Sequence, residues 1–257
     1  MLEIDIPNRL FAIKEIWFSD RPFDPLNVDS VTFHACKEDV AGCDFRKEAF
    51  STLLIDTTQE LDKLWMDLRP SYRQNIKKAE REGIEIRTNE AHAEFCAIND
   101  SFRSSKQLWE QSYSADFLRR NGVLFTMGHE GWVLGGIFFI KDERNMYGKV
   151  MATKRMQVDE DTKTIIGLGT RLMMWEGMKF AKVSGVERFD LGGIYTGTKP
   201  DPQQEAIRQF KLGFGGQRMD IFTYRKDYSP QMKLMRRYEG LKNELYIRLN
   251  RDRSQGH

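Results

Sequence analysis

The chain has 257 residues and a mass of 30.1 kDa, which at about 150 residues per domain allows one large domain or two small ones. Hydrophobic residues make up 40% and charged residues 30%, with a mean hydropathy of −0.58. This composition excludes a disordered chain, a collagen and an integral membrane protein. The net charge of +2 is too weak to indicate duplex DNA binding. Because residues 1–60 carry 6 basic and 12 acidic side chains, the remainder is mildly basic and could face an anionic ligand.

The cysteines point to a cytoplasmic protein. Cys36, Cys43 and Cys96 form no CxxC pair, which excludes a zinc ribbon and a thioredoxin-like site. Their odd number and wide spacing indicate reduced thiols. The first residues do not resemble a signal peptide, and no run of about 18 apolar residues predicts a membrane span. The four histidines lack metal-ligand spacing, so no metal site is predicted.

The beginning of the chain is typical of strands and turns. β-branched and aromatic runs at 14–20, 30–36 and 50–58 are separated by Pro, Asn, Asp and Gly. From Gln59 the pattern becomes helical, with apolar residues spaced i, i+3, i+4, i+7. We expect this helix to end at Pro70 and a strongly charged helix to follow over 71–82.

The rest of the chain alternates between strands and helices. Short polar turns separate the strands expected over 123–129, 132–141 and 146–154 and favour an antiparallel meander. A mixed, mostly antiparallel sheet flanked by helices on both faces satisfies the order, so the fold class is α/β (α+β), with the element order of the GNAT acyltransferase fold. The pattern predicts strands over 84–88, 123–129, 132–141, 146–154, 188–194 and 218–225, and helices over 91–121, 165–184, 202–213 and 229–250.

Three parts are expected along the chain. Residues 1–58 form an N-terminal β-rich extension, and residues 59–228 form the main domain. Residues 229–257 form a C-terminal basic helix and tail, which could meet RNA or an anionic membrane surface or could be an ordinary solvated helix.

The first candidate site opens the helix expected over 165–184. Gly167, Gly169 and Thr170, with Leu168 between them, would let the backbone approach a ligand at a helix N-terminus, where unpaired N–H groups suit a pyrophosphate. An ordinary strand-to-helix turn explains the same glycines.

The second candidate is the end of the strand over 188–194. Asp190 is followed by Gly192 and Gly193 at the C-terminal end of a strand, where ligands bind in α/β sheets, and Tyr195 adds a hydroxyl. Asp190 could accept a proton or orient an amine. It could equally be a hydrogen-bonded residue that stabilises the turn.

Two further stretches carry positive charge. In the helix over 202–213, Lys211 lies beside an apolar face that includes Phe210, so it could stabilise an oxyanion or hold a phosphate, or it could be a solvated lysine. On the helix over 71–82, Arg73 and Lys77 share a face. They suit phosphate recognition, although a solvated surface helix explains them as well.

Taken together, these stretches resemble the FemABX-type transferases. SYRQNIKKAEREGIEIR is similar to that family's Arg-x-x-Ile-Lys-Lys-Ala-x-x-x-Gly-Val stretch, with Ile84 in place of Val. FDLGGI and QFKLGFGG are similar to its Asp-x-Gly-Gly and Phe-Lys-x-x-Phe-Gly signatures. The resemblance covers residues 50–225 and implies a single GNAT-type domain. It also implies an active-site role for Lys211 and a position near the acceptor's phosphates for Arg73 and its neighbours.

The resemblance implies an N-acyltransferase that acts by direct attack of an amine on the donor. Gly167-Leu168-Gly169-Thr170 looks like the acyl-CoA loop of GNAT enzymes, so a CoA thioester is the expected donor. The expected acceptor is an amino sugar or a cell-wall or surface-glycan precursor. No residue forms a nucleophile–base pair, which favours direct attack. Asp190 or a water is expected to take the amine proton, and backbone N–H groups and Lys211 are expected to stabilise the oxyanion.

Alternatives remain open at this point. An aminoacyl-tRNA could replace acyl-CoA as donor for a peptidoglycan-type acceptor, which would bring tRNA as a partner. A GNAT-like module that binds without catalysis is the alternative from another class. A homodimer could supply additional binding surface, and a lipid-linked acceptor would imply peripheral contact with the inner membrane surface.

Overall fold

The computed structural model describes residues 1–106, 112–197 and 201–238. The chain forms two compact units, one of Ser51–Asp220 and one of Met1–Phe50 together with the chain from Ile221 onward. The boundaries between the two units fall inside β4 (Arg46–Asp56) and β10 (Gln217–Asp227), so each of these strands contributes residues to both units. The three-part division predicted at 58/59 and 228/229 stays a prediction.

The unit of residues 1–50 and 221–238 is built on strands. In it β1 (Leu2–Ile6) pairs antiparallel with β2 (Ile13–Trp17), and β2 pairs parallel with β3 (Ser30–Cys36). The second half of β10 pairs antiparallel with β3, and residues 230–238 are helical. The remainder of the predicted C-terminal helix and tail, 239–257, lies outside the described residues. The core of this unit is formed by buried side chains of β2, β3 and β10: Ile16, Val31, Phe33, Cys36, Phe222 and Tyr224.

The Ser51–Asp220 unit contains a mixed sheet with the order β4-β9-β8-β7-β6-β5. β8 and β9 are parallel, and the other neighbours are antiparallel, so the predicted meander and the mostly antiparallel class are confirmed. The strands are β5 (Glu85–Thr88), β6 (Gly122–His129), β7 (Trp132–Lys141), β8 (Asn145–Thr153) and β9 (Arg188–Ile194).

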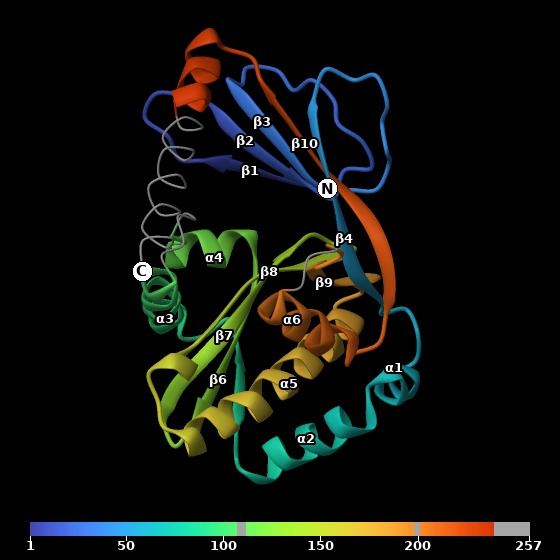
Figure 1. The fold of residues 1–257 in the computed structure, drawn as a ribbon, viewed down its shortest axis with the longest axis vertical. Coiled ribbons are helices and arrows are strands. Elements are labelled where there is room, and N and C mark those ends of the chain that lie inside the picture. Colours follow the sequence, from blue (N-terminus) through green and yellow to red (C-terminus); the bar gives the residue numbers. More distant parts are fainter. Residues whose placement is uncertain (107–111, 198–200, 239–257) are drawn as a thin grey trace, which may run out of the picture. The chain divides into compact units, whose positions relative to one another are not determined.

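Helices cover both faces of this sheet (Figure 1). On one face, Phe180 of α5 packs edge-on against Phe125 of β6, with ring centroids 5.5 Å apart, and α2 lies along α5. On the other face, Phe117 of α4 packs against Phe138 of β7. The helices are α1 (Leu61–Asp67), α2 (Pro70–Arg81), α3 (His92–Ser105), α4 (Ala115–Asn121), α5 (Glu160–Val183) and α6 (Pro202–Leu212), with a short 3-10 turn at Lys154–Met156.

The single helix predicted over 91–121 is wrong in one respect. Two helices, α3 and α4, occupy the range, with residues 107–111 between them outside the described residues. The hydroxyl of Ser114 accepts a hydrogen bond from the backbone N–H of Phe117 at 3.1 Å and so caps a new helix. Among the helices of the described residues, none has a stretch long and apolar enough to cross a bilayer.

Candidate active site

The candidate site lies where β8 and β9 separate. Their parallel ladder pairs Asn145 with Arg188, Met146 with Phe189 and Tyr147 with Asp190, and goes no further, although both strands continue. Beyond Tyr147 the register of β8 against β7 shifts, so that Phe139 faces Gly148 and Phe138 faces Val150. A bulge of this kind bends a strand away from its neighbour. The backbone edges of β8 and β9 are therefore no longer paired with each other beyond Asp190.

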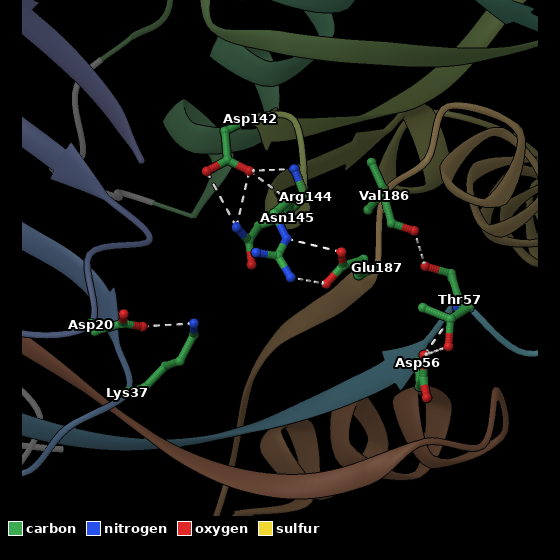
Figure 2. A network of polar contacts seen from close by, with 10 residues as sticks. Asp20, Lys37, Asp56, Thr57, Asp142, Arg144, Asn145, Val186 and Glu187 are labelled. Carbon is green, nitrogen blue, oxygen red and sulfur yellow. Dashed lines mark hydrogen bonds and ion pairs between the residues drawn. The ribbon is translucent and has the colours of Figure 1, made fainter.

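A polar network holds the starts of these two strands together (Figure 2). The Arg144 guanidinium forms a bidentate pair with Glu187, at 2.9 and 2.7 Å. The carboxylate of Asp142 accepts from the backbone N–H of Arg144 at 2.9 Å and of Asn145 at 2.7 Å. The backbone N–H groups of Glu187 and Arg188 both donate to the carbonyl of Arg144. The two strands are thus connected at their starts and are no longer paired with each other beyond Asp190.

Asp190 is the buried acid of the site. Only 7% of its surface is exposed, and its Oδ1 accepts hydrogen bonds from the hydroxyl of Thr52 on β4 and from the backbone N–H of Gly192, the latter at 2.7 Å. Burial is the largest influence and raises the pKa of Asp190 to about 6, against the hydrogen bonds and the nearby charge of Lys211. The carboxyl therefore titrates near neutral pH.

Lys211 approaches the same place from the last turn of α6. Its Nζ donates to the carbonyl of Gly193 at 2.7 Å. Burial lowers the pKa of Lys211 to about 8, although the charge of Asp190 opposes this shift. The half-buried ammonium is the cation nearest to the acid in this site, and it remains mostly charged at neutral pH.

Gly192 is where these groups converge. It has φ = +77°, and a Cβ placed on it would lie 2.9 Å from the carbonyl oxygen of Gly148, 3.5 Å from Lys211 Nζ and 3.7 Å from the Tyr147 hydroxyl. Both the left-handed backbone and the close approach require glycine here. The Asp-x-Gly-Gly pattern is therefore explained by geometry as well as by resemblance.

Tyr147 is the residue that the sequence analysis missed. Its phenol oxygen accepts from the backbone N–H of Gly193, and burial together with the charge of Asp190 raises the pKa of Tyr147 to about 12. Gly193 is thus held at both ends, its N–H by Tyr147 and its carbonyl by Lys211. A tyrosine inside a strand is an ordinary packing residue by sequence, and only its register opposite Asp190 reveals it. Thr52 was missed for the same reason.

A cavity of about 650 Å³ lies directly beyond the end of β9. Tyr195 lines it together with apolar side chains of Ile194 and Leu212, and substrate binding by Tyr195 stays a prediction. Four charged residues also line it: Asp201, Glu205, Arg208 and Arg218. Because Leu212 follows Lys211 in the chain, the cavity and the acid–base pair share β9 and α6.

Phe210 packs in an aromatic cluster beside Lys211. Its ring lies 5.2 Å from that of Phe214 and 6.2 Å from that of Tyr72 on α2, and the Tyr72 hydroxyl donates to the carbonyl of Phe210 at 3.0 Å. The Arg171 guanidinium lies over the Tyr72 and Phe210 rings, at 4.6 and 5.7 Å. The cluster fixes α6 and so the position of Lys211. Substrate binding by Phe210 stays a prediction.

The helix start predicted at 165 is wrong. α5 begins at Glu160, because the carboxylate of Asp159 caps it by accepting from the backbone N–H of Thr162 at 2.8 Å. Gly167, Leu168, Gly169 and Thr170 therefore lie inside the helix, and the Thr170 hydroxyl donates to the carbonyl of Ile166. These four residues therefore do not open a helix toward a pyrophosphate.

The structure also assigns Arg73 a different role from the predicted one. Its Nη1 donates to the carbonyls of Met66 and Leu68 at 2.7 and 2.8 Å, so its guanidinium caps the C-terminal end of α1. Lys77, one turn later, is exposed on α2. The described residues include no cluster of three or more His, Cys, Asp or Glu side chains suited to a metal ion.

No protein-family model and no curated protein matches the sequence. Solved structures do match. FemX superposes with a TM-score of 0.57 and 10% identity, over 81% of this chain and 74% of that one. L-PGS from Bacillus licheniformis gives 0.54 and 14%, over 80% and 70% of the two chains. A C-terminal domain, DUF2156, from Agrobacterium fabrum gives 0.54 and 12%, over 77% and 68%. At these identities the likeness concerns the fold, and the chain accordingly has a FemABX/GNAT-like fold.

Proposed function

We propose that the protein transfers an acyl or aminoacyl group to an amine at the opening between β8 and β9. One observation carries this proposal: a buried carboxyl, Asp190, and a half-buried ammonium, Lys211, converge where the parallel ladder ends. Paired groups whose environments bring their pKa values close to neutral are suited to acid–base work. The FemABX/GNAT-like fold, which FemX and L-PGS share, supports the same reaction class.

The transfer proceeds by direct attack. The amine nitrogen of the acceptor forms a bond to the donor carbonyl carbon, and the ionised Asp190 takes the proton that the amine loses. The Lys211 ammonium stabilises the negative charge that develops on the carbonyl oxygen. When the tetrahedral adduct collapses, the bond to the leaving sulfur or oxygen breaks. The proton returns from Asp190 to the leaving group, so that an amide and a free thiol or hydroxyl result.

The donor proposed from the resemblance is an acyl-CoA. The start of α5 does not fit a CoA pyrophosphate well, because Asp159 caps it and Glu160 and Asp161 follow in its first turn. Carboxylates at a helix N-terminus neutralise the positive end of the dipole and repel an anion. This observation favours the second candidate, an aminoacyl-tRNA ester, for which the exposed Lys77, Lys78 and Arg81 of α2 offer a basic face.

A transfer assay with the full chain tests the proposal. Labelled acetyl-CoA and a mixture of labelled aminoacyl-tRNAs are each incubated with amino sugars and peptidoglycan-type amines. Lys211→Met is expected to lower the transfer rate by about a hundredfold or more, because one oxyanion donor is lost. Lys182→Met is the matched control, since its Nζ also donates to a backbone carbonyl, that of Gln59 at 2.6 Å.

The control variant should retain its rate within about twofold, as expected for a surface position. A Lys211→Met protein that folds and transfers at the wild-type rate would contradict the role of Lys211. A folded wild-type protein that accepts neither donor, with any of these amines, would contradict the proposed function.

A further inference from the structure

The cavity beyond β9 carries four charged side chains, and its two acids are already engaged. Oδ1 of Asp201 accepts from the backbone N–H of Gln204 at 3.0 Å and caps α6. Oε2 of Glu205 accepts from Arg208 Nε at 2.8 Å, and Oε1 accepts from Arg208 Nη2 at 3.0 Å and from Gln209 at 2.8 Å. The hydrogen bonds from Arg208 and Gln209 lower the pKa of Glu205 to about 2, so it stays ionised and paired.

The two arginines of the cavity keep unused donors. A guanidinium has five N–H groups. Arg208 directs two of its nitrogens, Nε and Nη2, at Glu205. Arg218 directs Nε and Nη2 at the hydroxyl oxygen of Ser51, at 3.2 and 2.9 Å. In the described part of the chain, Nη1 of each arginine makes no side-chain hydrogen bond, so both cations can bind a further acceptor.

The anchoring of both arginines prepares them for a ligand. The hydroxyl of Ser51, which accepts from Arg218, donates to Asp220 at 2.6 Å, and the Arg218 guanidinium lies 3.9 Å from that carboxylate. The bidentate pair with Glu205 restrains Arg208 in the same way. Restrained guanidinium groups lose little further freedom on binding and suit the planar or tetrahedral oxygens of carboxylates and phosphates. A cationic ligand would meet acids that are already paired.

From this arrangement we infer that the cavity binds an oxyanion, a phosphate or a carboxylate, through Arg208 and Arg218. Assigning the oxyanion to a substrate rests on the proposed function. Because the cavity continues from β9 and α6, which also carry Asp190 and Lys211, an anionic group bound there would anchor a substrate of the transfer beside the reacting atoms. The site differs from the basic face of α2, where the sequence had placed phosphate recognition.

Titration of the full chain with inorganic phosphate and, separately, with acetate tests the inference. The arginine Nε–H signals in NMR spectra report binding, and saturation gives a dissociation constant for each anion. Arg208→Gln and Arg218→Gln are each expected to weaken binding of the preferred anion by about tenfold or more, because a charge-assisted hydrogen bond is lost. The anion with the lower dissociation constant identifies whether the cavity prefers a phosphate or a carboxylate.

Arg144→Gln is the matched control. Arg144 forms a bidentate pair with Glu187 (Figure 2), as Arg208 does with Glu205. The Arg144 variant therefore removes a similar ion pair at a place outside the cavity. This variant should bind the anion within about twofold of the wild type. Thr196→Glu provides a second route: the side chain is exposed and lines the cavity, so an added carboxylate should abolish binding without breaking an ion pair.

Saturable binding that Thr196→Glu and the two cavity arginine variants weaken, and that Arg144→Gln leaves unchanged, supports the inference. Binding that none of the cavity variants affects overturns it, as does a folded wild-type protein that binds neither anion. Because binding is measured without turnover, the two proposals can fail separately. A protein that binds the anion but transfers nothing would contradict only the proposed function.

Discussion

Asp190 links the stability of the fold to the proposed proton transfer. Its pKa in the folded chain, about 6, lies above the ordinary value of 3.8, so the folded state binds the proton more tightly than the unfolded state does. Folding is therefore penalised once the carboxyl ionises, and the penalty grows as the pH rises from the ordinary value through the folded one. The same ionised form is the one that accepts a proton in the proposed reaction.

Asp190→Asn is accordingly expected to stabilise the protein and to abolish transfer. An Asn Oδ1 can still accept from Thr52 and Gly192, and the buried charge is removed. The gain in the free energy of unfolding should be about 2 kcal/mol at about pH 8 and close to zero at about pH 4. Urea unfolding at the two pH values measures it.

Asp142→Asn is the control with the opposite sign. Burial of Asp142 is outweighed by several hydrogen bonds to its carboxylate, among them those from Asn145 and Arg144, and its pKa is lowered. Its ionised form stabilises the fold above the ordinary pKa, so this variant should lose stability at about pH 8, by about 1 kcal/mol. An Asp190→Asn protein less stable than the wild type at both pH values would contradict our account of Asp190.

Gly192 supplies a second prediction at the scale of the residue. Gly192→Ala would force a side chain into a left-handed backbone and against the carbonyl of Gly148. Gly185→Ala is matched in backbone, with φ = +72°, but a Cβ there meets nothing within 4 Å. We expect Gly185→Ala to cost about 1 kcal/mol and Gly192→Ala about 2–3 kcal/mol, with loss of transfer only in the latter. Equal costs in urea unfolding would show that crowding at Gly192 is unimportant.

At the scale of the element, α5 shows how a local pattern misled. Glycines favour a turn, and two of them in three residues indicate a helix start. Asp159 is an equally good start signal, and the chain follows it because Ile166, Leu168, Leu172 and Met173 become buried on one helix. Burial of these apolar side chains outweighs the low helix propensity of the glycines.

The two glycines of α5 should respond to alanine in opposite ways. A Cβ on Gly167 meets nothing closer than 3.6 Å, so Gly167→Ala should stabilise the protein by about 0.5–1 kcal/mol through helix propensity. A Cβ on Gly169 would lie 2.7 Å from the sulfur of buried Met127 and 3.3 Å from Ile84. Gly169→Ala should therefore destabilise it by about 1–2 kcal/mol.

Thermal unfolding of both variants checks this pair. If Gly167→Ala instead left stability unchanged and abolished binding of acetyl-CoA, the residue would be a ligand contact after all. That result would restore the loop interpretation of residues 167–170.

At the scale of the whole molecule, a lysine of β10 stabilises the unit of residues 1–50 and 221–238. Lys226 is paired with Asp24 and Asp44 at 2.7 and 2.9 Å, and lies 5.0 Å from the ring centroids of Phe45 and Tyr228. It thereby joins two loops to β10. Its side chain is 18% exposed, so these interactions are partly shielded from solvent.

Lys226→Met should loosen that unit selectively, because its two ion pairs are lost. Hydrogen exchange should accelerate in residues 20–46 and 221–238 and remain unchanged in β6 and β7. Lys37→Met is the control, since Lys37 forms an ion pair with Asp20 at 2.7 Å in the same unit (Figure 2). Uniform acceleration across the chain would show that the two units unfold together.

Local patterns predicted most of the secondary structure of this protein. Helical spacing and Pro70 located α1 and α2, and short polar turns located the β6–β8 meander, because these signals act over a few residues. The Asp-x-Gly-Gly and Phe-Lys stretches also pointed to Asp190 and Lys211 from sequence alone. What the sequence by itself determined is therefore the order of most elements, and it singled out Asp190 and Lys211, whose catalytic roles stay predictions.

Tertiary structure decided how those groups are used. Tyr147 and Thr52 meet Asp190 only through strand register, and Arg73 donates to carbonyls at the end of α1. Arg208 on α6 and Arg218 on β10 line one cavity, and Arg218 donates there to Ser51, which lies far away in sequence. Register, burial and pKa depend on contacts between distant segments, and no local pattern encodes them.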